Sequence, residues 1–260
     1  MPLVLSVGGM YGESRSQPGN AGRLIPLIPE DYKRIVFFTG AGMSAECGVP
    51  TYRGKGGIWD KYNWEEVACQ SAFEKNPEDV LQFHELRRCR VQKCKPHAGH
   101  TIISNLQKSH SNVVVITQNI DGIHQLSGSE YVIELHGSLW RLRCLQGGKI
   151  IEDRGKYYNS KRCDCGAWLR PDIIWFGDNL DRLTVEQAYE SSGKADLFIS
   201  IGTSGEVWPA AGIPQIAREN SAFMIEINPE ETEVSYMFEE HIRELSSTAL
   251  RKLFNENNSN

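Results

Sequence analysis

The chain has 260 residues, enough for one large α/β domain with a smaller insertion, and its 40% hydrophobic and 23% charged residues are ordinary for a soluble enzyme. The 28 basic and 33 acidic residues give a formal charge of −5, which argues against general binding to nucleic acids or anionic membranes, since both need a basic surface. No apolar run reaches the roughly 18 residues that cross a bilayer. Seven scattered cysteines form no disulfide pattern, so we expect a reducing compartment, the cytoplasm in the simplest case and an organelle as the alternative.

The first part of the chain, residues 1–32, is rich in glycine, serine and proline and poor in acidic residues. This composition fits a flexible extension or a weak organellar presequence, and we favour the extension. We do not expect a secretory signal, because the start lacks the basic stretch that precedes the apolar part of such signals.

Five short runs of apolar and β-branched residues follow. They cover residues 34–39, 112–117, 131–135, 196–201 and 223–227. Continuous apolar runs of this length are typical of parallel strands that are covered on both faces. Helical patterns alternate with them, over residues 77–94, 98–109, 184–192 and 241–254. The alternation predicts a doubly wound, Rossmann-like α/β fold with a parallel sheet.

A glycine-rich turn follows the first predicted strand and contains Gly40, Ala41, Gly42 and Ser44. Two closely spaced glycines let the backbone approach a pyrophosphate, which the next helix N-terminus would attract. The alternative is a tight turn without a ligand, and the third glycine, Gly48, comes late for a dinucleotide fingerprint. Alone, this segment is weak evidence for nucleotide binding.

The continuation of this segment carries a family resemblance. Residues 39–44 and 48–54 closely resemble the signature of the sirtuin family, and four further motifs follow in the family's order. They are Thr117-Gln118-Asn119-Ile120-Asp121, His136-Gly137-Ser138, Gly202-Thr203-Ser204 and Asn228. The resemblance runs from about residue 33 to residue 255. It implies an NAD-dependent protein-lysine deacylase, which moves the acyl group of an acyl-lysine protein or peptide to ADP-ribose and releases nicotinamide.

The resemblance also implies a division of the chain. An NAD-binding domain would comprise residues 33–50, 97–138 and 169–256. A small domain would combine residues 51–96, which are aromatic-rich and mostly helical, with residues 139–168, which contain three cysteines. Residues 257–260 would form a tail, and we expect a monomer.

His136 is the expected catalytic base. It follows the run 131–135, at the carboxyl edge where open α/β sheets bind ligands. An imidazole with an unperturbed pKa of about 6.5 can remove a proton at neutral pH. The alternative is a structural histidine bonded to the backbone.

The other NAD-binding residues are assigned by resemblance. Asn119, which is expected to act in catalysis, and Asp121 would line the nicotinamide pocket beside Gln118. Asp121 alternatively caps the following helix. Tyr52 would bind NAD, and Arg53 would lie near the departing nicotinamide and the phosphates. The alternative for Arg53 is an exposed charge in water. The adenosine half would be held by Gly202, Thr203, Ser204 and Asn228.

The acyl pocket departs from the common sirtuin pattern. Thr51 replaces the aspartate of many deacetylase-type members, as in the branch that removes succinyl, malonyl and glutaryl groups. That branch holds the acyl carboxylate with a Tyr-x-x-Arg pair, and here His84 and Arg87 occupy the two positions. An arginine can bind a carboxylate bidentately, and a histidine could add a second donor, which would be cationic if its pKa rises near the carboxylate. The alternative is a basic helix face in water, or neutralisation of either residue by Glu85.

The cysteine segment, residues 139–168, is incomplete as a zinc site. Sirtuins usually carry two cysteine pairs, whereas only Cys144, Cys163 and Cys165 are present here. Structural zinc takes four N or S ligands, and no histidine lies between residues 137 and 240. The fourth ligand would be Asp153, Asp164 or water, and the alternative is a relic held by packing alone.

Trp175, Phe176 and Gly177 lie at the end of a predicted strand over residues 173–176 and resemble the sirtuin strip that pairs with the substrate backbone. The alternative is aromatic core packing.

Two rival functions use the same site: an NAD glycohydrolase or ADP-ribosyltransferase, and a non-catalytic NAD-binding module. The second does not explain His136, because binding alone requires no base.

Overall fold

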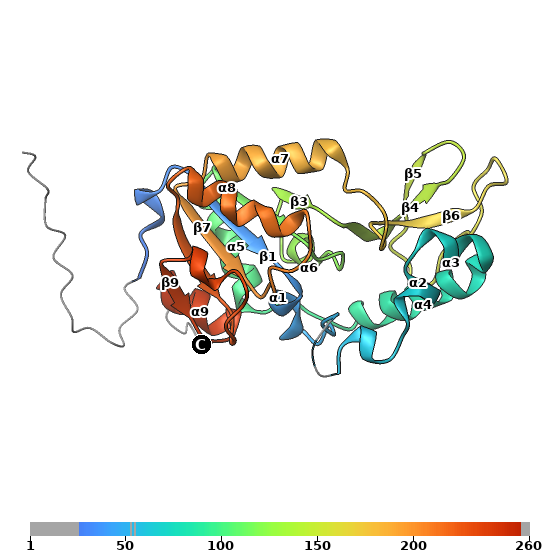
Figure 1. Cartoon of the computed structure of the whole chain (residues 1–260), viewed down its shortest axis with the longest axis horizontal. Coiled ribbons are helices and arrows are strands. Elements are labelled where there is room, and N and C mark those ends of the chain that lie inside the picture. The colour runs from blue at the N-terminus through green and yellow to red at the C-terminus, as the bar shows by residue number, and fades with distance from the viewer. Residues whose placement is uncertain (1–25, 53, 55, 256–260) are drawn as a thin grey trace, which may run out of the picture.

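The computed structural model describes residues 26–52, 54 and 56–255. Its largest unit is a six-stranded sheet in the order β3-β2-β1-β7-β8-β9, in which all neighbouring strands are parallel. The strands are β1 (Ile35–Thr39), β2 (Val113–Thr117), β3 (Val132–Glu134), β7 (Leu197–Ile201), β8 (Phe223–Ile227) and β9 (Glu240–Ile242). The predicted doubly wound, Rossmann-like fold is confirmed (Figure 1).

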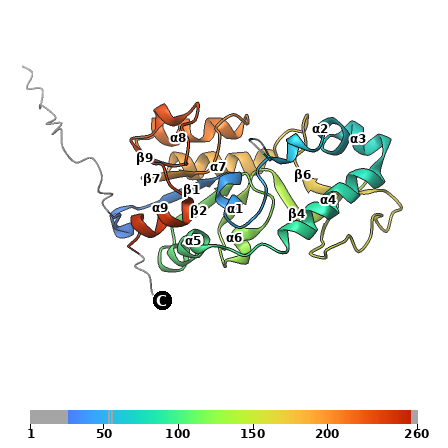
Figure 2. The ribbon, with the colours of Figure 1, turned by 90° about the horizontal axis from the view of Figure 1, so that it is seen from below.

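The central strands are mostly apolar because helices cover both faces of this sheet (Figure 2). Ile35 and Phe37 of β1 pack into one cluster with α5 (Ala98–Ser109) and α9 (Ser246–Leu253). Val36 and Phe38 pack into another with α7 (Arg182–Gly193) and α8 (Ile213–Glu219). Successive side chains of a strand point to opposite faces, so a strand between two helical layers is mostly apolar on both faces.

The C-terminal segment differs from the prediction. The periodicity predicts one helix over residues 241–254, and this is wrong at its start, because Glu240–Ile242 form β9 and α9 begins only at Ser246. β9 pairs with β8, and Ile242 is buried in the core of the sheet. This segment is too short for its local sequence to determine its conformation, so its pairing with β8 in the folded chain determines it.

A second unit lies beside the parallel sheet and has its own core (Figure 1). Its antiparallel sheet has the order β5-β4-β6, with β4 (Gly137–Cys144), β5 (Ile150–Glu152) and β6 (Leu169–Ile173). The helices α2 (Trp64–Val67), α3 (Gln70–Lys75) and α4 (Pro77–Val91) pack with this sheet. The predicted strand over residues 173–176 is wrong, since β6 ends at Ile173.

The remaining elements are short. They are η1 (Pro29–Asp31), α1 (Ala41–Ala45), η2 (Ile58–Asp60), α6 (Ile123–Leu126), η3 (Ala210–Gly212) and η4 (Ser235–Met237). The described end of the expected N-terminal extension packs on the core, since the amide of Leu27 donates to the carbonyl of Leu253 at 2.7 Å. Among the described residues, no helix combines the length and apolarity that a membrane span requires.

The carboxyl ends of the parallel strands are level with one another. Thr39 at the end of β1 is paired with Thr117 of β2 and Ile201 of β7, and Ile201 is paired with Ile227 of β8. The segments that follow these strands therefore meet at one edge of the sheet, where open α/β folds bind ligands. Every NAD-binding motif expected from the sequence, except residues 52 and 53, follows one of these strand ends.

Candidate functional site

A cavity of about 680 Å³ lies at this edge and reaches into the second unit. Its volume is in the range of pockets that take large organic ligands. The predicted base His136 lines it, and so do most residues predicted to bind NAD, namely Gly40, Ala41, Gly42, Tyr52, Gln118, Asn119, Gly202, Thr203, Ser204 and Asn228. All residues predicted to bind substrate line it as well, namely His84, Arg87, Trp175, Phe176 and Gly177. Ser44 and Asp121 do not, and Arg53 lies outside the described residues.

Close packing between two turns explains the glycines of the first turn, and the sequence alone did not show this packing. The turn after β1 contacts the turn after β7, where the amide of Gly42 donates to the carbonyl of Gly202 at 2.8 Å. A Cβ atom at Gly42 would lie 2.6 Å from the Cα atom of Gly202, and Gly202 itself has a φ of +59°. Both positions therefore require glycine for the fold itself, independently of any ligand.

His136 is held in one tautomer at the cavity. Its Nδ1 atom lies 2.9 Å from the carbonyl oxygen of Gln118, which can only accept, so Nδ1 carries the proton and Nε2 is left as the acceptor. Burial lowers the pKa of His136 below its usual range, although the bond to the Gln118 carbonyl opposes the shift. The ring is thus a neutral base at pH 7, and it has both features considered at the outset, a backbone bond and a place in the cavity.

Asn119 and Gln118 tie the strand-end segments together. The Nδ2 atom of Asn119 donates to the carbonyl of Gly40 at 2.8 Å and to the hydroxyl of Ser44 at 3.2 Å. The Nε2 atom of Gln118 donates to the hydroxyl of Thr203 at 2.8 Å. Both side chains therefore have a fixed orientation at the cavity wall.

Asp121 lies behind this wall. It is 7% exposed, and its Oδ1 atom accepts from the amide of Ile123 at 2.9 Å, as the capping alternative predicts. Burial raises the pKa of Asp121, and the hydrogen bonds from Ile123 and Ser44 oppose that shift. The structure thus places Asp121 and Ser44 where they support Asn119, outside the cavity lining.

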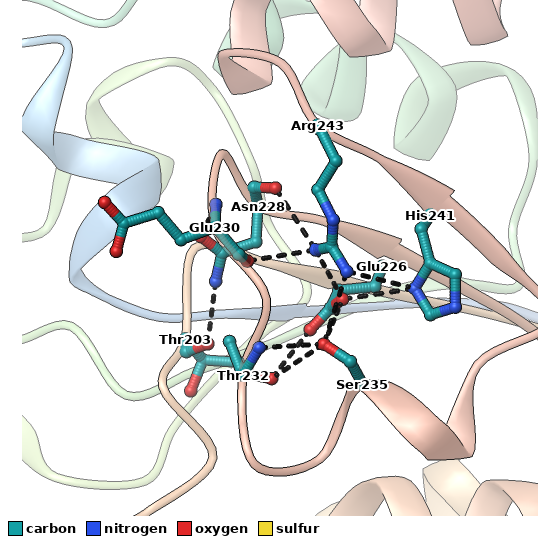
Figure 3. Close-up of polar contacts among 8 residues, drawn as sticks. All are labelled: Thr203, Glu226, Asn228, Glu230, Thr232, Ser235, His241 and Arg243. Atoms are coloured by element: carbon teal, nitrogen blue, oxygen red, sulfur yellow. Dashed lines mark hydrogen bonds and ion pairs between the residues drawn. The ribbon is translucent and has the colours of Figure 1, made fainter.

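A polar network supports the segment 228–233, which lines the cavity (Figure 3). Glu226 is 2% exposed, and its carboxylate accepts from Thr232, Ser235, His241 and Arg243. Burial alone would raise the pKa of Glu226, but these hydrogen bonds outweigh it and the pKa is lowered.

Arg243 connects this network to the cavity wall. Its Nη1 atom also donates to the carbonyls of Asn228 at 3.3 Å and Glu230 at 2.9 Å (Figure 3). Asn228 in turn donates through Nδ2 to the carbonyl of Thr203 at 3.0 Å. Sequence reasoning missed Glu226 and Arg243. Glu226 lies in a buried strand and Arg243 follows another strand, and no local sequence pattern links two such residues.

Arg87 meets Tyr52 at the second unit's end of the cavity. The Nη2 atom of Arg87 lies 2.5 Å from the Tyr52 hydroxyl, and the guanidinium carbon lies 4.9 Å from the centre of the Tyr52 ring. Glu85 does not neutralise Arg87 through a hydrogen bond, since its carboxylate accepts from the amide of Tyr158 at 2.9 Å.

His84 carries no positive charge in the structure. His84 is fully buried, its ring stacks on Trp175 with planes 14° apart, and its Nε2 atom accepts from the Trp175 indole at 3.3 Å. Burial first, and then the nearby charges of Arg87 and Arg170, lower the pKa of His84 well below its usual range. The histidine is therefore neutral, and Tyr52 occupies the place beside Arg87 that His84 was expected to fill.

Trp175 and Phe176 differ in their surroundings. Trp175 is 4% exposed and packs in the core of the second unit, as the packing alternative predicts. Phe176 is 40% exposed, although its amide donates to the carbonyl of Ala68 at 3.1 Å. Only the second of these two rings has much surface left for a substrate.

The three cysteines of the cysteine segment converge, with ligand atoms within 4.8 Å of one another. The amide of Gly147 donates to the sulfur of Cys144, and such backbone bonds lower the pKa of Cys144 to about 7. A fourth ligand is missing from the group among the described residues. The set therefore does not complete the tetrahedral zinc site of four protein ligands that is usual for structural zinc.

Asp153 as a fourth zinc ligand is wrong. Its carboxylate is 2.5 Å from Nη2 of Arg88 and accepts from the amides of Gly155 and Asn159. Asp164 pairs instead with Lys149, and its side chain is 94% exposed. The buried Arg88–Asp153 pair thus joins α4 to the cysteine segment in a place where sequence reasoning expected a metal ligand.

A second group of possible ligands, Cys47, His97 and His100, was not expected from the sequence. His97 is not available as a ligand, because Nε2 lies 2.8 Å from the carbonyl oxygen of Met43 and Nδ1 accepts from the amide of Gly99. Burial raises the pKa of Cys47 to about 11, which disfavours the thiolate that binds metals. We assign this group a structural role.

Comparisons with known proteins agree with the arrangement of the cavity. A sequence profile described as "Sir2 family" matches residues 40–209. A protein of Aquifex aeolicus named "NAD-dependent protein deacylase" is 43% identical over 226 residues, covering 85% of this chain and 93% of that protein. A protein of Thermococcus sibiricus with the same name is 37% identical over 238 residues, covering 88% and 93%.

Solved structures are similar over the same extent. The crystal structure of a Sir2 homolog in complex with NAD has a TM-score of 0.81 and 36% identity, covering 87% of this chain and 90% of that one. A mutant Sir2 homologue in complex with ADP-ribose has a TM-score of 0.82 and 35% identity, covering 86% and 92%. The likeness spans both the parallel sheet and the second unit.

Proposed function

The chain belongs to the Sir2 family, the sirtuins, and on that premise we propose that it is an NAD-dependent protein deacylase that transfers the acyl group of acyl-lysine to ADP-ribose and releases nicotinamide. The observation that carries the proposal is His136, a neutral base of defined tautomer in the cavity where the strand-end segments meet. A base in that position is what the reaction needs, because a ribose hydroxyl must lose its proton when the acyl group is transferred.

Each part of the cavity has a role in this proposal. The turns around Gly42 and Gly202 present backbone to the dinucleotide, and Asn119 orients the ribose that reacts. The acyl oxygen of the substrate attacks C1′ of that ribose and nicotinamide leaves. The acyl group then passes to a ribose hydroxyl, and with the uptake of one water the lysine leaves as the free amine. His136 accepts the hydroxyl proton at Nε2, while its Nδ1–H stays bonded to Gln118. We further propose that the parallel sheet and the second unit act as two domains, with acyl-lysine and NAD bound between them.

Nicotinamide release measured with and without an acyl-lysine peptide tests this function. We expect release that depends on the peptide, with a matching gain of acyl-ADP-ribose. Acetyl-, succinyl- and glutaryl-lysine versions of one peptide should be compared in the same assay. Equal release without any peptide would instead indicate an NAD glycohydrolase, and label transferred from NAD to protein would indicate an ADP-ribosyltransferase.

We propose that acidic acyl groups such as succinyl, malonyl and glutaryl are preferred over acetyl. Arg87 supports this proposal, because it lines the cavity and carries a positive charge beside the hydroxyl of Tyr52. A guanidinium and a phenol can both donate to one carboxylate, which replaces the pair expected from His84 and Arg87. The neutral His84 would shape the wall of the pocket rather than bind the charge.

The variant Arg87→Met should lower the ratio of desuccinylation to deacetylation by roughly 10- to 150-fold, since a hydrogen bond to a charged group contributes about 1.5–3 kcal/mol. The ratio of the two kcat/KM values is the measurement. Arg90→Met is the matched control, because Arg90 is exposed on the same helix and does not line the cavity. An unchanged ratio in Arg87→Met would remove the proposed acyl preference and leave the deacylase assignment standing.

A further inference from the structure

The segment 228–233 is a loop that follows β8, and five of its six residues line the cavity. It begins with Asn228, which the sirtuin motifs assign to the adenosine half of NAD. The backbone groups of a loop are not fixed by the regular hydrogen bonds of a helix or a sheet, so other groups must bind them. The shape of this part of the cavity wall therefore depends on the side chains that lie behind the loop.

Arg243 binds the loop from behind (Figure 3). Its Nη1 atom donates to the carbonyl of Asn228 at 3.3 Å and to the carbonyl of Glu230 at 2.9 Å. The same atom lies 2.7 Å from Oε2 of Glu226. A guanidinium is planar and rigid, so the acceptors that it binds are held at fixed positions relative to one another. Arg243 thus fixes two loop carbonyls relative to strand β8.

Glu226 is the counterion that keeps Arg243 in this place. It is 2% exposed and lies in β8, whose other four residues are apolar. Its carboxylate also accepts from the hydroxyl of Thr232, inside the loop, at 2.8 Å. A buried ion pair often contributes no more stability than apolar residues of similar size would. Stability alone therefore does not explain a glutamate at this position, whereas the fixed loop does.

Asn228 carries the position of the loop to the turn after β7. Its Nδ2 atom donates to the carbonyl of Thr203 at 3.0 Å, and the hydroxyl of Thr203 accepts from Gln118 at 2.8 Å. Thr203, Asn228 and Gln118 line the cavity, whereas Arg243 and Glu226 do not. A shift of the loop would therefore move Asn228 away from Thr203 and alter the wall that the nucleotide contacts.

We propose that Arg243, with Glu226 as its counterion, is a positioning residue for NAD that holds Asn228 and the loop in the conformation that binds the adenosine half. This inference rests on the proposed function and adds to it two residues that lie outside the cavity. The effect should appear in the binding of NAD and not in kcat, because Arg243 is bonded to the loop while His136 is held by Gln118.

The variant Arg243→Met tests the inference through binding and kinetics. The Kd for ADP-ribose, measured by isothermal titration calorimetry, and the KM for NAD should both rise by roughly 5- to 100-fold, the range of coupling within one hydrogen-bond network. The kcat at saturating NAD and the KM for the acyl peptide should stay close to the wild-type values. A variant that merely folds less completely would lower kcat and leave the Kd of the folded fraction unchanged.

Two further variants separate positioning from stability. Arg141→Met is the matched control, because Arg141 is also half-buried, lies 2.6 Å from a carboxylate oxygen of Glu134 and does not line the cavity. This control should keep the Kd for ADP-ribose. Arg243→Lys keeps a positive charge beside Glu226 but not the planar fork. It should fold as the wild type does and bind ADP-ribose with an affinity between those of the wild type and Arg243→Met.

A double variant tests whether Arg243 acts through Asn228. Asn228→Ala should raise the Kd for ADP-ribose by itself. In that background Arg243→Met should raise the Kd by a smaller factor than it does in the wild type, because residues of one network have non-additive effects. Independent effects, with the two factors multiplying in full, would contradict a route through Asn228.

An unchanged Kd for ADP-ribose in both Arg243 variants would overturn the inference, as would an equal rise in Arg141→Met. The proposed function can fail separately. A wild-type protein that binds ADP-ribose but turns over no acyl peptide would contradict the deacylase assignment alone, and the ADP-ribose titrations would still decide the role of Arg243. A wild-type protein that binds neither NAD nor ADP-ribose would contradict both proposals.

Discussion

Replacing His136 with alanine should lower kcat for deacylation by about 10²–10⁴-fold, the usual contribution of a positioned general base. The Kd for NAD should change little, because the glycine turns and Asn119 supply the proposed nucleotide contacts. Fold stability should also be close to that of the wild type, since only the side-chain bond to Gln118 is lost. Rapid-quench or steady-state kinetics with saturating NAD and acyl peptide measure the effect.

The pH dependence of the reaction provides a second readout for His136. Burial lowers the pKa of His136, so the neutral form that acts as base is complete at pH 7 and above. Activity should be lost as the pH falls through this lowered pKa, that is, below about 6.5 and not above it. This acid limb should be absent from the residual activity of His136→Ala.

A histidine outside the cavity serves as the control for this variant. His110 pairs with Glu30 on the surface and does not line the cavity, so His110→Ala should leave kcat and its pH profile as they are. A His136→Ala protein with kcat within a factor of a few of the wild type would show that the imidazole is not the base. The proposed mechanism would then have to be given up, although NAD binding could persist.

Replacing Arg88 with methionine should lower the free energy of unfolding by about 3–5 kcal/mol, as expected when one partner of a buried ion pair is removed. Arg88 has no exposed surface, and Asp153 is 4% exposed. The guanidinium also donates to the carbonyls of Asp153 and Gly155 and lies 4.3 Å from the centre of the Tyr158 ring. Its loss would leave a buried carboxylate and two carbonyls without their cation. Urea unfolding followed by tryptophan fluorescence measures the change.

Matched variants separate this pair from ordinary surface charges. Arg182 pairs with Glu186 on the exposed side of α7, so Arg182→Met should change the free energy of unfolding by no more than about 0.5 kcal/mol. The double variant Arg88→Met with Asp153→Asn should be more stable than Arg88→Met alone, because the uncompensated charge is gone. A loss below about 1 kcal/mol in Arg88→Met would contradict a structural role for the pair.

The same unfolding assay weighs the ion pair against a metal. Three thiols form the cysteine group, and Asp153 is engaged by Arg88. We therefore expect a chelator to change the unfolding midpoint of the wild type less than Arg88→Met does. A larger effect of the chelator, together with about one zinc per chain in metal analysis, would show that the metal and not the ion pair holds this segment.

Much of the large sheet could be predicted, because short stretches of the sequence indicate its strands. The runs that contain β1, β2, β7 and β8 are mostly apolar on both faces, a pattern typical of strands that are covered on both sides. The carboxyl-edge rule then brought His136, Asn119 and Gly202 to one side of the sheet without any knowledge of strand order. The helix over residues 98–109 was predicted to the residue for a similar reason, since its apolar side faces the core.

The predictions that failed concern side chains whose partners are distant in the sequence. From the sequence, His84 is a candidate donor on a helix face, but in the structure Trp175, which follows β6, contacts its ring, and burial lowers the pKa of His84. Asp153 was a candidate metal ligand from the sequence, but in the structure it pairs with Arg88, which lies 65 residues earlier in the chain. The residues of β9 have a helical pattern in the sequence, but in the structure they pair with β8 as a strand.

The sequence by itself therefore determined the parallel α/β sheet, the sirtuin motifs at its carboxyl edge and the imidazole among them, because these depend on periodicity and on the order of short segments. Only the tertiary structure decided which charges are free to act. It buried His84, paired Arg88 with Asp153, joined Arg87 to Tyr52 and anchored the segment 228–233 through Arg243. The ionisation and orientation of a side chain depend on its neighbours in space, and those neighbours are set only when the chain has folded.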